Sequence, residues 1–330
     1  MHTPLFTIFG QPVPSYFAML VGGFALVTWM AMRWAKRGRL DHEVMLDLGL
    51  FSLIAGVAGA RVLHVIADGY FWDYVHLCTD PSVVAWHVDQ SECRAIEGVW
   101  DATASVCRPA HGAFTLDGCL AWAAFWRGGL TYYGGLIAAA AYGIYFLRRE
   151  KFPVLKGTDG AAMSISLGLF FGRMGCFLGG CCFGLPTDGP FGMSFPAWSP
   201  ASEAQFRLGT LANAGMPSLP VHPTQLYEAL GCLLLAATLM LVVHPRKRFD
   251  GQIFCFFLAG YSALRFSLEY LRADDRGGLL GLSTSQLISV LVVIGTGVLY
   301  VRLQKHAKDL LAAPPAAPPP APAAPDAAAA

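Results

Sequence analysis

The hydrophobic residues of this chain are grouped into long runs, which are separated by short polar clusters and by two long polar connections. A helix needs about 20 apolar residues to cross the hydrocarbon core of a membrane. Seven runs approach or exceed this length, at about 16–33, 44–67, 129–147, 158–179, 224–243, 251–271 and 281–301. The pattern predicts an all-α integral membrane protein with seven transmembrane helices.

The positive charges predict how these helices are oriented. If the spans alternate from an outside N-terminus, one side of the membrane receives 14 of the 23 Lys and Arg residues. Cytoplasmic loops carry such an excess, so we expect an outside N-terminus and a cytoplasmic C-terminus. The first run has no Lys or Arg ahead of it, whereas a signal peptide does. We therefore interpret it as a retained helix.

The predicted topology gives two long extracytoplasmic loops, at about 68–128 and 180–223. We expect one transmembrane domain over residues 1–308, followed by a disordered Ala/Pro-rich cytoplasmic tail over 309–330. The first loop holds an even number of cysteines, which in an oxidising compartment predicts disulfides. The pairing stays open among Cys78, Cys93, Cys107 and Cys119.

Composition supports a membrane protein and argues against one class of partner. Hydrophobic residues make up 55% of the chain and charged residues only 14%, against about 25% charged in soluble domains. The net charge is +1, and nucleic-acid binding proteins usually present a strongly basic face. We expect contact with membrane lipid and no nucleic-acid partner.

Three arginines lie inside the predicted spans, namely Arg61, Arg173 and Arg265. A charge at mid-bilayer costs roughly 2.5–3.5 kcal/mol on insertion scales and usually marks function. At 1.5 Å per residue, all three lie about 21–26 Å from the cytoplasmic ends of their helices. They therefore share one layer in the outer half of the membrane. Internal pairing, with Glu269, Asp68 or helix-end carbonyls, is the alternative to a binding site.

Other polar residues gather at the same level. Arg265, Glu269 and Arg272 have i, i+4, i+7 spacing and are expected on one helix face. His64 lies three residues after Arg61, on the same face of that helix. Further polar residues at the span ends are Tyr16, Tyr132, Tyr133, His222, Gln225, Tyr227 and Glu228. Because the planar guanidinium suits phosphate oxygens, the layer predicts a site for a phospholipid headgroup.

Four segments resemble the prolipoprotein diacylglyceryl transferases over roughly residues 10–305. They are GGLTYYGGLI (128–137), GRMGCFLGGCCFG (172–184), HPTQLYE (222–228) and GYSALRFSLEYLRADD (260–275). The resemblance implies a multi-pass enzyme of the bacterial cytoplasmic (inner) membrane, with its active site toward the outer leaflet. It also implies phosphatidylglycerol as donor, glycerol 1-phosphate as by-product, and the lipobox cysteine of a prolipoprotein precursor as acceptor. No cofactor is expected.

The resemblance also assigns roles to residues of this chain. Arg173 and Arg265 match the essential arginines. His222 and Tyr133 are added as catalytic candidates, since the histidine that often serves as base is replaced by Tyr133. The predicted substrate-binding residues are Arg61, Tyr16, Tyr227, Tyr261, Glu269, Arg272 and Gly184.

The departures from the family pattern leave alternatives open. The proton of the acceptor thiol could pass to His222, which we prefer, or to His64 or Tyr133. Cysteines 176 and 181 replace an asparagine and an acidic residue, and glycine 179 replaces a second asparagine. The C-x4-C-C spacing of the cysteines at 176, 181 and 182 is not a common zinc pattern, so small-residue packing is expected and no metal site is predicted. A catalytically altered paralogue, or a lipid-binding or transport protein, is the alternative function.

Overall fold

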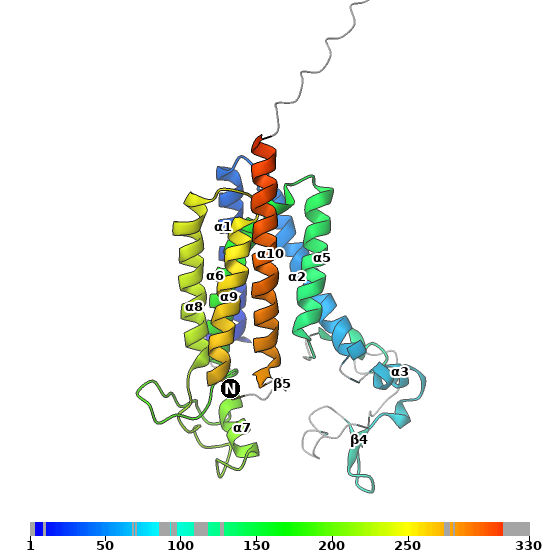
Figure 1. Cartoon of the computed structure of the whole chain (residues 1–330). Helices are drawn as coiled ribbons and strands as arrows, with labels where there is room; N and C mark the ends of the chain where they lie inside the picture. The colour runs from blue at the N-terminus through cyan, green and yellow to red at the C-terminus, as the bar shows by residue number, and fades with distance from the viewer. Residues whose placement is uncertain are drawn as a thin grey trace, which may run out of the picture. The chain divides into compact units, whose positions relative to one another are not determined.

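The structure is a computed structural model whose regular elements are mainly helices (Figure 1). The predicted tail from residue 313 onward and Asp68 lie outside the part of the chain that it describes. The described residues are 4–312 without 9–10, 68, 70, 86–92, 94–97, 109–117, 126–128, 274–277 and 280.

Five helices are long and apolar enough to cross a membrane, which fits an integral membrane protein. They are α1 (Ser15–Arg37), α2 (Glu43–Ala67), α6 (Val154–Gly179), the segment Thr224–Arg246, and Thr284–Asp309 of α10 (Thr284–Ala312). The segment Thr224–Arg246 consists of α8 (Thr224–Thr238), a π-helical turn and a short 3-10 turn.

The other two predicted spans are also helical but shorter. Helix α5 (Tyr132–Arg149) has 18 residues, and α9 (Gln252–Leu268) has 17. At 1.5 Å per residue, helices of this length reach about 26 Å, slightly less than the roughly 30 Å of a typical hydrocarbon core. Each hydrophobic run of the sequence therefore forms a helix.

The chain divides into two compact units, a central unit of residues 25–160 and a terminal unit of residues 1–24 and 161–330. In the central unit, α2 packs closely against α5 because glycines face each other. A Cβ atom on Gly59 would collide with the backbone of Gly134 and the side chain of Ala138. Such small residues allow helices to approach closely in membranes, where dispersion contacts drive helix association.

The polar segment of the central unit is held by two disulfides, Cys78–Cys119 and Cys93–Cys107. The expectation of disulfides among these four cysteines is confirmed, and the pairing is now assigned. The elements of this segment are α3 (Phe71–Thr79), η1 (Pro81–Val83), the antiparallel strands β3 (Val99–Asp101) and β4 (Val106–Arg108), and η2 (Ala121–Ala123).

The terminal unit contains three helices that pack in the order α8, α9, α10, and α9 contacts both neighbours (Figure 1). Its smaller elements are the antiparallel pairs β1 (Pro4–Ile8) with β2 (Gln11–Pro14) and β5 (Gly278–Leu279) with β6 (Leu282–Ser283), and helix α7 (Pro200–Arg207).

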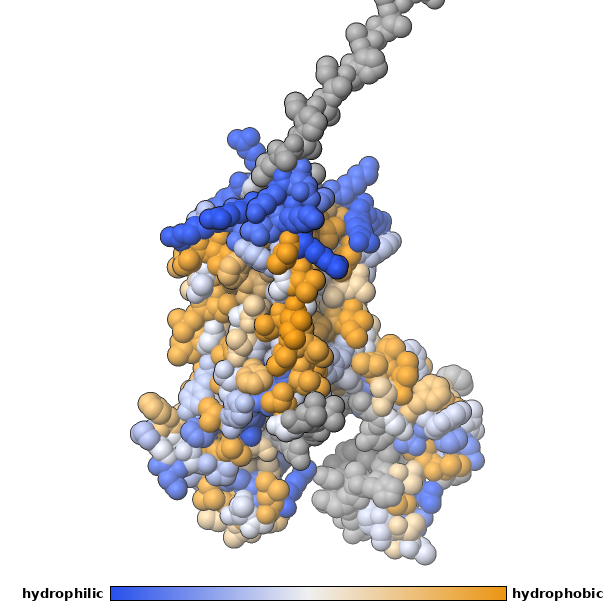
Figure 2. Space-filling view, in the orientation of Figure 1, coloured by the Kyte–Doolittle hydropathy of each residue, from blue (hydrophilic) through white to orange (hydrophobic). Residues whose placement is uncertain are grey.

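The surface of α10 has the two zones expected of a membrane span. Figure 2 shows hydrophobic side chains along the helix and hydrophilic residues gathered at its C-terminal end. Exposed apolar residues on the helix include Leu291, Ile294, Val298 and Val301. Apolar side chains that find no partner inside the protein are stable against lipid, so this face fits the hydrocarbon core.

The predicted placement of Arg272 is wrong. The sequence pattern puts Arg272 on the same helix face as Arg265 and Glu269. In the structure, α9 ends at Leu268, a 3-10 turn η6 (Glu269–Leu271) follows, and Arg272 is extended with φ −84° and ψ 146°. Tertiary pairing overrides the helical pattern here, because Arg272 forms an antiparallel bridge with Gly184.

Candidate active site

A buried carboxylate, that of Glu228, is the centre of the polar cluster in the terminal unit. Its side chain is only 2% exposed and lies on the first turns of α8. Arg173 of α6 places Nε 3.1 Å from Oε2, and Arg265 of α9 places Nη1 3.4 Å from the same oxygen. Tyr261 donates to the other oxygen at 3.1 Å. Two guanidiniums from separate helices thus converge on one carboxylate.

A second carboxylate fixes the other edge of the Arg265 guanidinium. Nη2 of Arg265 lies 3.1 Å from Oε2 of Glu269, and the Ser283 hydroxyl donates to Oε1 of Glu269 at 2.9 Å. Glu269 therefore orients an arginine rather than presenting a lone base. Paired and hydrogen-bonded charges of this kind are the form in which buried ionic groups are stable.

Arg173 keeps donor capacity within this cluster. Its ion pair with Glu228 uses Nε, and no described residue accepts a hydrogen bond from its Nη atoms. Guanidinium N–H groups that are available in a poorly solvated region suit an anion of the phosphate class.

Gly184 allows three segments of the chain to meet beside this cluster. A Cβ atom there would collide with the carbonyl oxygen of Leu271, the side chain of Thr224 and the Cβ of His222. Its N–H donates to the carbonyl of His222 at 2.9 Å, and it bridges to Arg272. The requirement for glycine here is one of close backbone approach, which fixes where Arg272 enters the site.

His222 and Tyr16 also belong to the terminal unit. Nδ1 of His222 lies 3.4 Å from the hydroxyl of Tyr227. The ring of Tyr16 packs against Gly175 of α6, where Cδ2 lies 3.0 Å from the position of a Cβ atom. Gly175 is two residues from Arg173, so Tyr16 lies beside the arginine-bearing segment of α6.

Arg61 lies in the central unit, and its described contacts are internal. It donates to the carbonyls of Trp122 and Ala121, each at 2.7 Å, and of Gly129 at 3.2 Å. It also donates to the hydroxyl of Tyr74 at 3.1 Å. These contacts match the carbonyl pairing that the sequence left open as an alternative, and they tie α2 to the segment before α5.

The other two candidates for the base are also in the central unit. Gly129, with φ +66°, approaches the imidazole of His64 so closely that a Cβ atom would collide with it. Tyr133 begins α5, is 47% exposed, and packs edge-on against Tyr132 with ring centroids 5.6 Å apart. Neither side chain belongs to the unit that contains Glu228.

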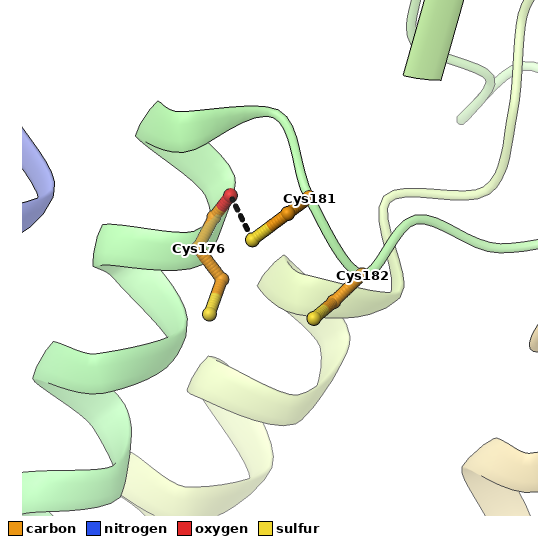
Figure 3. Close-up of side chains that lie close together, drawn as sticks. All are labelled: Cys176, Cys181 and Cys182. Atoms are coloured by element: carbon orange, nitrogen blue, oxygen red, sulfur yellow. Dashed lines mark hydrogen bonds between the residues drawn. The ribbon is translucent and has the colours of Figure 1, made fainter. Parts of the chain in front are cut away.

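Three cysteine side chains converge just after α6. Cys176 lies on the last turns of that helix, and Cys181 and Cys182 lie on the loop that follows (Figure 3). Their three sulfur atoms all lie within 4.8 Å of one another. Hydrogen bonds from the other two thiols lower the pKa of Cys182, and Arg173 and Arg272 act in the same direction. For Cys181, hydrogen bonds with Cys176 and Cys182 raise the pKa instead, and burial adds to this effect.

Comparisons with known proteins agree with the motifs at this cluster. A family model described as prolipoprotein diacylglyceryl transferase matches residues 4–87 and 106–302. The chain belongs to this family. A Bordetella bronchiseptica protein named phosphatidylglycerol--prolipoprotein diacylglyceryl transferase is 35% identical over 87% of this chain and 89% of its own. A Clostridium tetani protein of that name is 27% identical over 89% of this chain and 94% of its own.

Sequence reasoning missed two features of this transferase-family site. Glu228 was placed in the polar layer but not recognised as the shared partner of Arg173 and Arg265. The available signal was charge balance, because two arginines in one layer need carboxylates near them. The convergence of the cysteine sulfurs was also missed, since residues 176 and 181 come together only through the reversal of the chain after α6.

Proposed function

We propose that this family member transfers the diacylglyceryl group of phosphatidylglycerol to the lipobox cysteine thiol of exported prolipoproteins, with release of glycerol 1-phosphate. The names of its relatives support the donor and the acceptor. The observation that carries the proposal is the convergence of Arg173 and Arg265 on buried Glu228. This arrangement presents fixed cations where a lipid phosphate would become a leaving group.

The reaction is an alkyl transfer to sulfur. The acceptor thiolate attacks the glyceryl carbon that bears the phosphate ester, a carbon–sulfur bond forms, and the carbon–oxygen bond breaks. The electron pair of that bond stays on the phosphate oxygen, so negative charge grows on the leaving group. Arg173 and Arg265 stabilise this charge, and donors held in place before the reaction provide several kcal/mol in such sites.

The remaining residues are proposed to position the substrates. Glu269 orients Arg265, Tyr261 holds the Glu228 carboxylate that pairs with both arginines, and Gly184 sets the position of Arg272. Proposed lipid or peptide contacts are Tyr16, Tyr227, Arg272 and Arg61. We favour His222 as the group that receives the thiol proton, because it alone among the three candidates lies in the unit that contains the arginine pair. His64 and Tyr133 remain the alternatives.

The membrane arrangement proposed for the enzyme has seven spans, with α5 and α9 crossing in addition to the five longer helices. The N-terminus lies outside and the C-terminus in the cytoplasm of a bacterial cell, so that residues 1–308 form the domain of the inner membrane. The disulfides of the segment 68–128 support an oxidising location for that loop. The arginine pair then faces the outer leaflet.

Product identification tests the proposed activity directly. The purified full chain is incubated with phosphatidylglycerol and a peptide that contains a lipobox cysteine, and both products are analysed by mass spectrometry. We expect the peptide to gain one diacylglyceryl group through a thioether, together with an equal amount of glycerol phosphate. A peptide with serine in place of the cysteine is the control. Binding of the lipid without either product would instead identify a lipid-binding paralogue.

Substitution of the paired arginines tests whether the convergence of Arg173 and Arg265 on Glu228 serves the reaction. We expect Arg173→Lys and Arg265→Lys each to lower the transfer rate at least tenfold, because a lysine ammonium cannot replace the planar, two-edged guanidinium. The rate is measured at saturating lipid, and thermal unfolding shows that each variant is folded. Arg207→Lys, on exposed α7, is the matched control and keeps the wild-type rate. Wild-type rates in both site variants would overturn the assignment.

A further inference from the structure

The three converging cysteines have a geometry that a packing role does not require. The two remaining described free cysteines, Cys232 and Cys255, are buried in helices and behave as small apolar side chains. Cys176, Cys181 and Cys182 are only partly buried. Their sulfurs lie close together between the end of α6 and the loop that follows it, and the Cys181 thiol donates to the Cys176 carbonyl at 3.7 Å (Figure 3).

The backbone that carries these thiols is fixed from both sides. The Cys181 N–H donates to the carbonyl of Cys176 at 3.2 Å, which closes the end of α6. From α8, the Gln225 amide donates to the carbonyl of Cys181 at 2.7 Å, and the Thr224 hydroxyl donates to that of Cys182 at 2.8 Å. Cys182 is held at φ +63°, a conformation that non-glycine residues seldom adopt.

The spacing of the sulfurs fits a soft divalent metal. Zinc binds thiolates at about 2.3 Å, so tetrahedral coordination separates two sulfurs by about 3.8 Å. The thiols lie within 4.8 Å of one another, and rotation about one side-chain bond per cysteine closes the remaining gap of about 1 Å. Three protein ligands with an open fourth position are typical of catalytic zinc sites rather than structural ones.

The surroundings of the cluster also suit a bound metal. Zinc with three thiolates carries one negative charge. Two arginines lie nearby: Arg173 is one helical turn before Cys176 on α6, and Arg272 pairs with Gly184, two residues after Cys182. The Gln225 side chain is 1% exposed, and its Oε1 accepts no hydrogen bond from any described residue. Since its amide nitrogen donates to the Cys181 carbonyl, this buried acceptor lies beside the loop that carries the thiols and can accept from a donor that arrives with a ligand.

We propose that Cys176, Cys181 and Cys182 bind one Zn²⁺ ion whose fourth position takes the acceptor cysteine of the prolipoprotein as a thiolate. The proposal rests on the proposed transferase function and names how its nucleophile is made. A metal-bound thiol is deprotonated at neutral pH, whereas a free thiol has a pKa of about 8.5. This accounts for an enzyme that has Tyr133 where a histidine base is expected.

The step balances without a further reactant. The acceptor thiol replaces water on zinc and its proton passes to solvent or to His222 before the carbon–oxygen bond breaks. The zinc-bound thiolate then donates its electron pair to the glyceryl carbon, and the phosphate leaves with the pair of the broken bond. The product thioether is neutral and a weak ligand, so water displaces it. Zinc changes no oxidation state.

The structure also places the proposed zinc site close to the proposed phosphate site. Arg173 and Cys176 are three residues apart on α6, a spacing that puts both side chains on one helix face, about 4.5 Å apart along its axis. The proposed phosphate ligand and a proposed zinc ligand therefore occupy consecutive turns. Nucleophile and leaving group would be bound one helical turn apart.

Metal content of the purified full chain is the first test. We expect about one zinc per chain, as in three-ligand sites, and loss of most of it in Cys182→Ser and Cys176→Ser. Cys232→Ser is the matched control, because it removes a buried thiol outside the cluster, and it keeps the zinc. Three results for the wild-type protein would overturn the proposal. It could hold no zinc after incubation with Zn²⁺, it could hold copper instead, or two of these thiols could form a disulfide.

Cobalt replacement tests the open position by a readout independent of turnover. Co²⁺ bound by three thiolates gives sulfur-to-metal charge-transfer absorption, and a lipobox peptide should intensify it by supplying a fourth thiolate. The same peptide with serine should leave the spectrum unchanged. An identical response to both peptides refutes the acceptor-binding role. If the zinc-free enzyme forms the thioether at the full rate, the zinc step is refuted and the transferase function still stands. If the protein binds zinc but forms no product, the transferase function is refuted and the zinc site still stands.

Discussion

Glu228 illustrates how one buried residue can determine the shape of a binding site. Its carboxylate accepts from Arg173, Arg265 and Tyr261, which come from two other helices. Without it, Arg173 would lose the carboxylate that its ion pair uses, and an uncompensated charge in a poorly solvated region is more costly than a paired one. The carboxylate therefore brings guanidiniums from two separate helices to one place.

Removal of that charge is expected to damage both stability and activity. Glu228→Gln preserves volume but leaves two neighbouring cations with one negative charge fewer, and removing one partner of a buried pair costs roughly 3–5 kcal/mol. We expect a lower unfolding temperature in detergent and at least a tenfold slower transfer rate. Glu203→Gln, on exposed α7, is the matched control. An unchanged unfolding temperature and rate for Glu228→Gln would show that the ion pairs do not organise the site.

Two of the three base candidates, His222 and Tyr133, can be separated by substitution. His222 hydrogen-bonds Tyr227 in the terminal unit, whereas Tyr133 is half exposed at the start of α5. We expect His222→Ala to slow transfer about tenfold, below the usual general-base contribution of 10²–10⁴, because zinc would share the deprotonation. Tyr133→Phe should change the rate less. The reverse order, measured at saturating lipid, would move the base to Tyr133.

At the level of elements, hydrophobic periodicity predicted where helices lie but not where tertiary contacts end them. All seven predicted runs are helical, since long apolar segments satisfy their backbone groups internally. Arg272 was misplaced because the sequence up to this residue still fits a helical pattern, whereas helical structure ends at Leu271. There the strand-like pairing of Arg272 with Gly184 depends on a segment nearly ninety positions away, which local periodicity cannot register.

The same limit applies to the loop after α6. The sequence showed three cysteines in a C-x4-C-C spacing, and this spacing alone favoured a role in close packing of small residues over a metal site. Gly180 with φ +71° and Cys182 with φ +63° reverse the chain after the helix and turn the thiols toward Cys176. Gly180 donates to the carbonyl of Phe177, and the Cys182 carbonyl accepts from the Thr224 hydroxyl; no linear motif displays these contacts. A spacing rule drawn from common zinc motifs therefore missed a cluster that depends on this turn.

At the level of the whole molecule, the family and the membrane class followed from the sequence because both depend on features spread along the chain. Motifs on successive helices predicted the family, and the family model confirms it. The division into a central and a terminal unit was not predicted, since it depends on which helices pack together. Apolar helix faces are similar to one another, so composition does not distinguish their partners.

The number of spans can be settled by the sides on which two connections lie. With seven spans, residues 150–153 between α5 and α6 are cytoplasmic and residues 180–223 are outside. If only the five longest helices crossed from an outside N-terminus, these two locations would be exchanged. The positive cluster of Arg148, Arg149, Lys151 and Lys156 would then lie outside, against the positive-inside tendency.

Reporter fusions distinguish the two arrangements. We expect alkaline phosphatase joined after residue 212 to be active, because that enzyme requires its disulfides and hence an oxidising compartment, and joined after residue 151 to be inactive. A fluorescent protein joined after residue 308 is the common control, since both arrangements place that end in the cytoplasm. Activity after residue 151 without activity after residue 212 would support five spans. It would also place the loop that carries the cysteine cluster on the cytoplasmic side, where an exported precursor could not reach it.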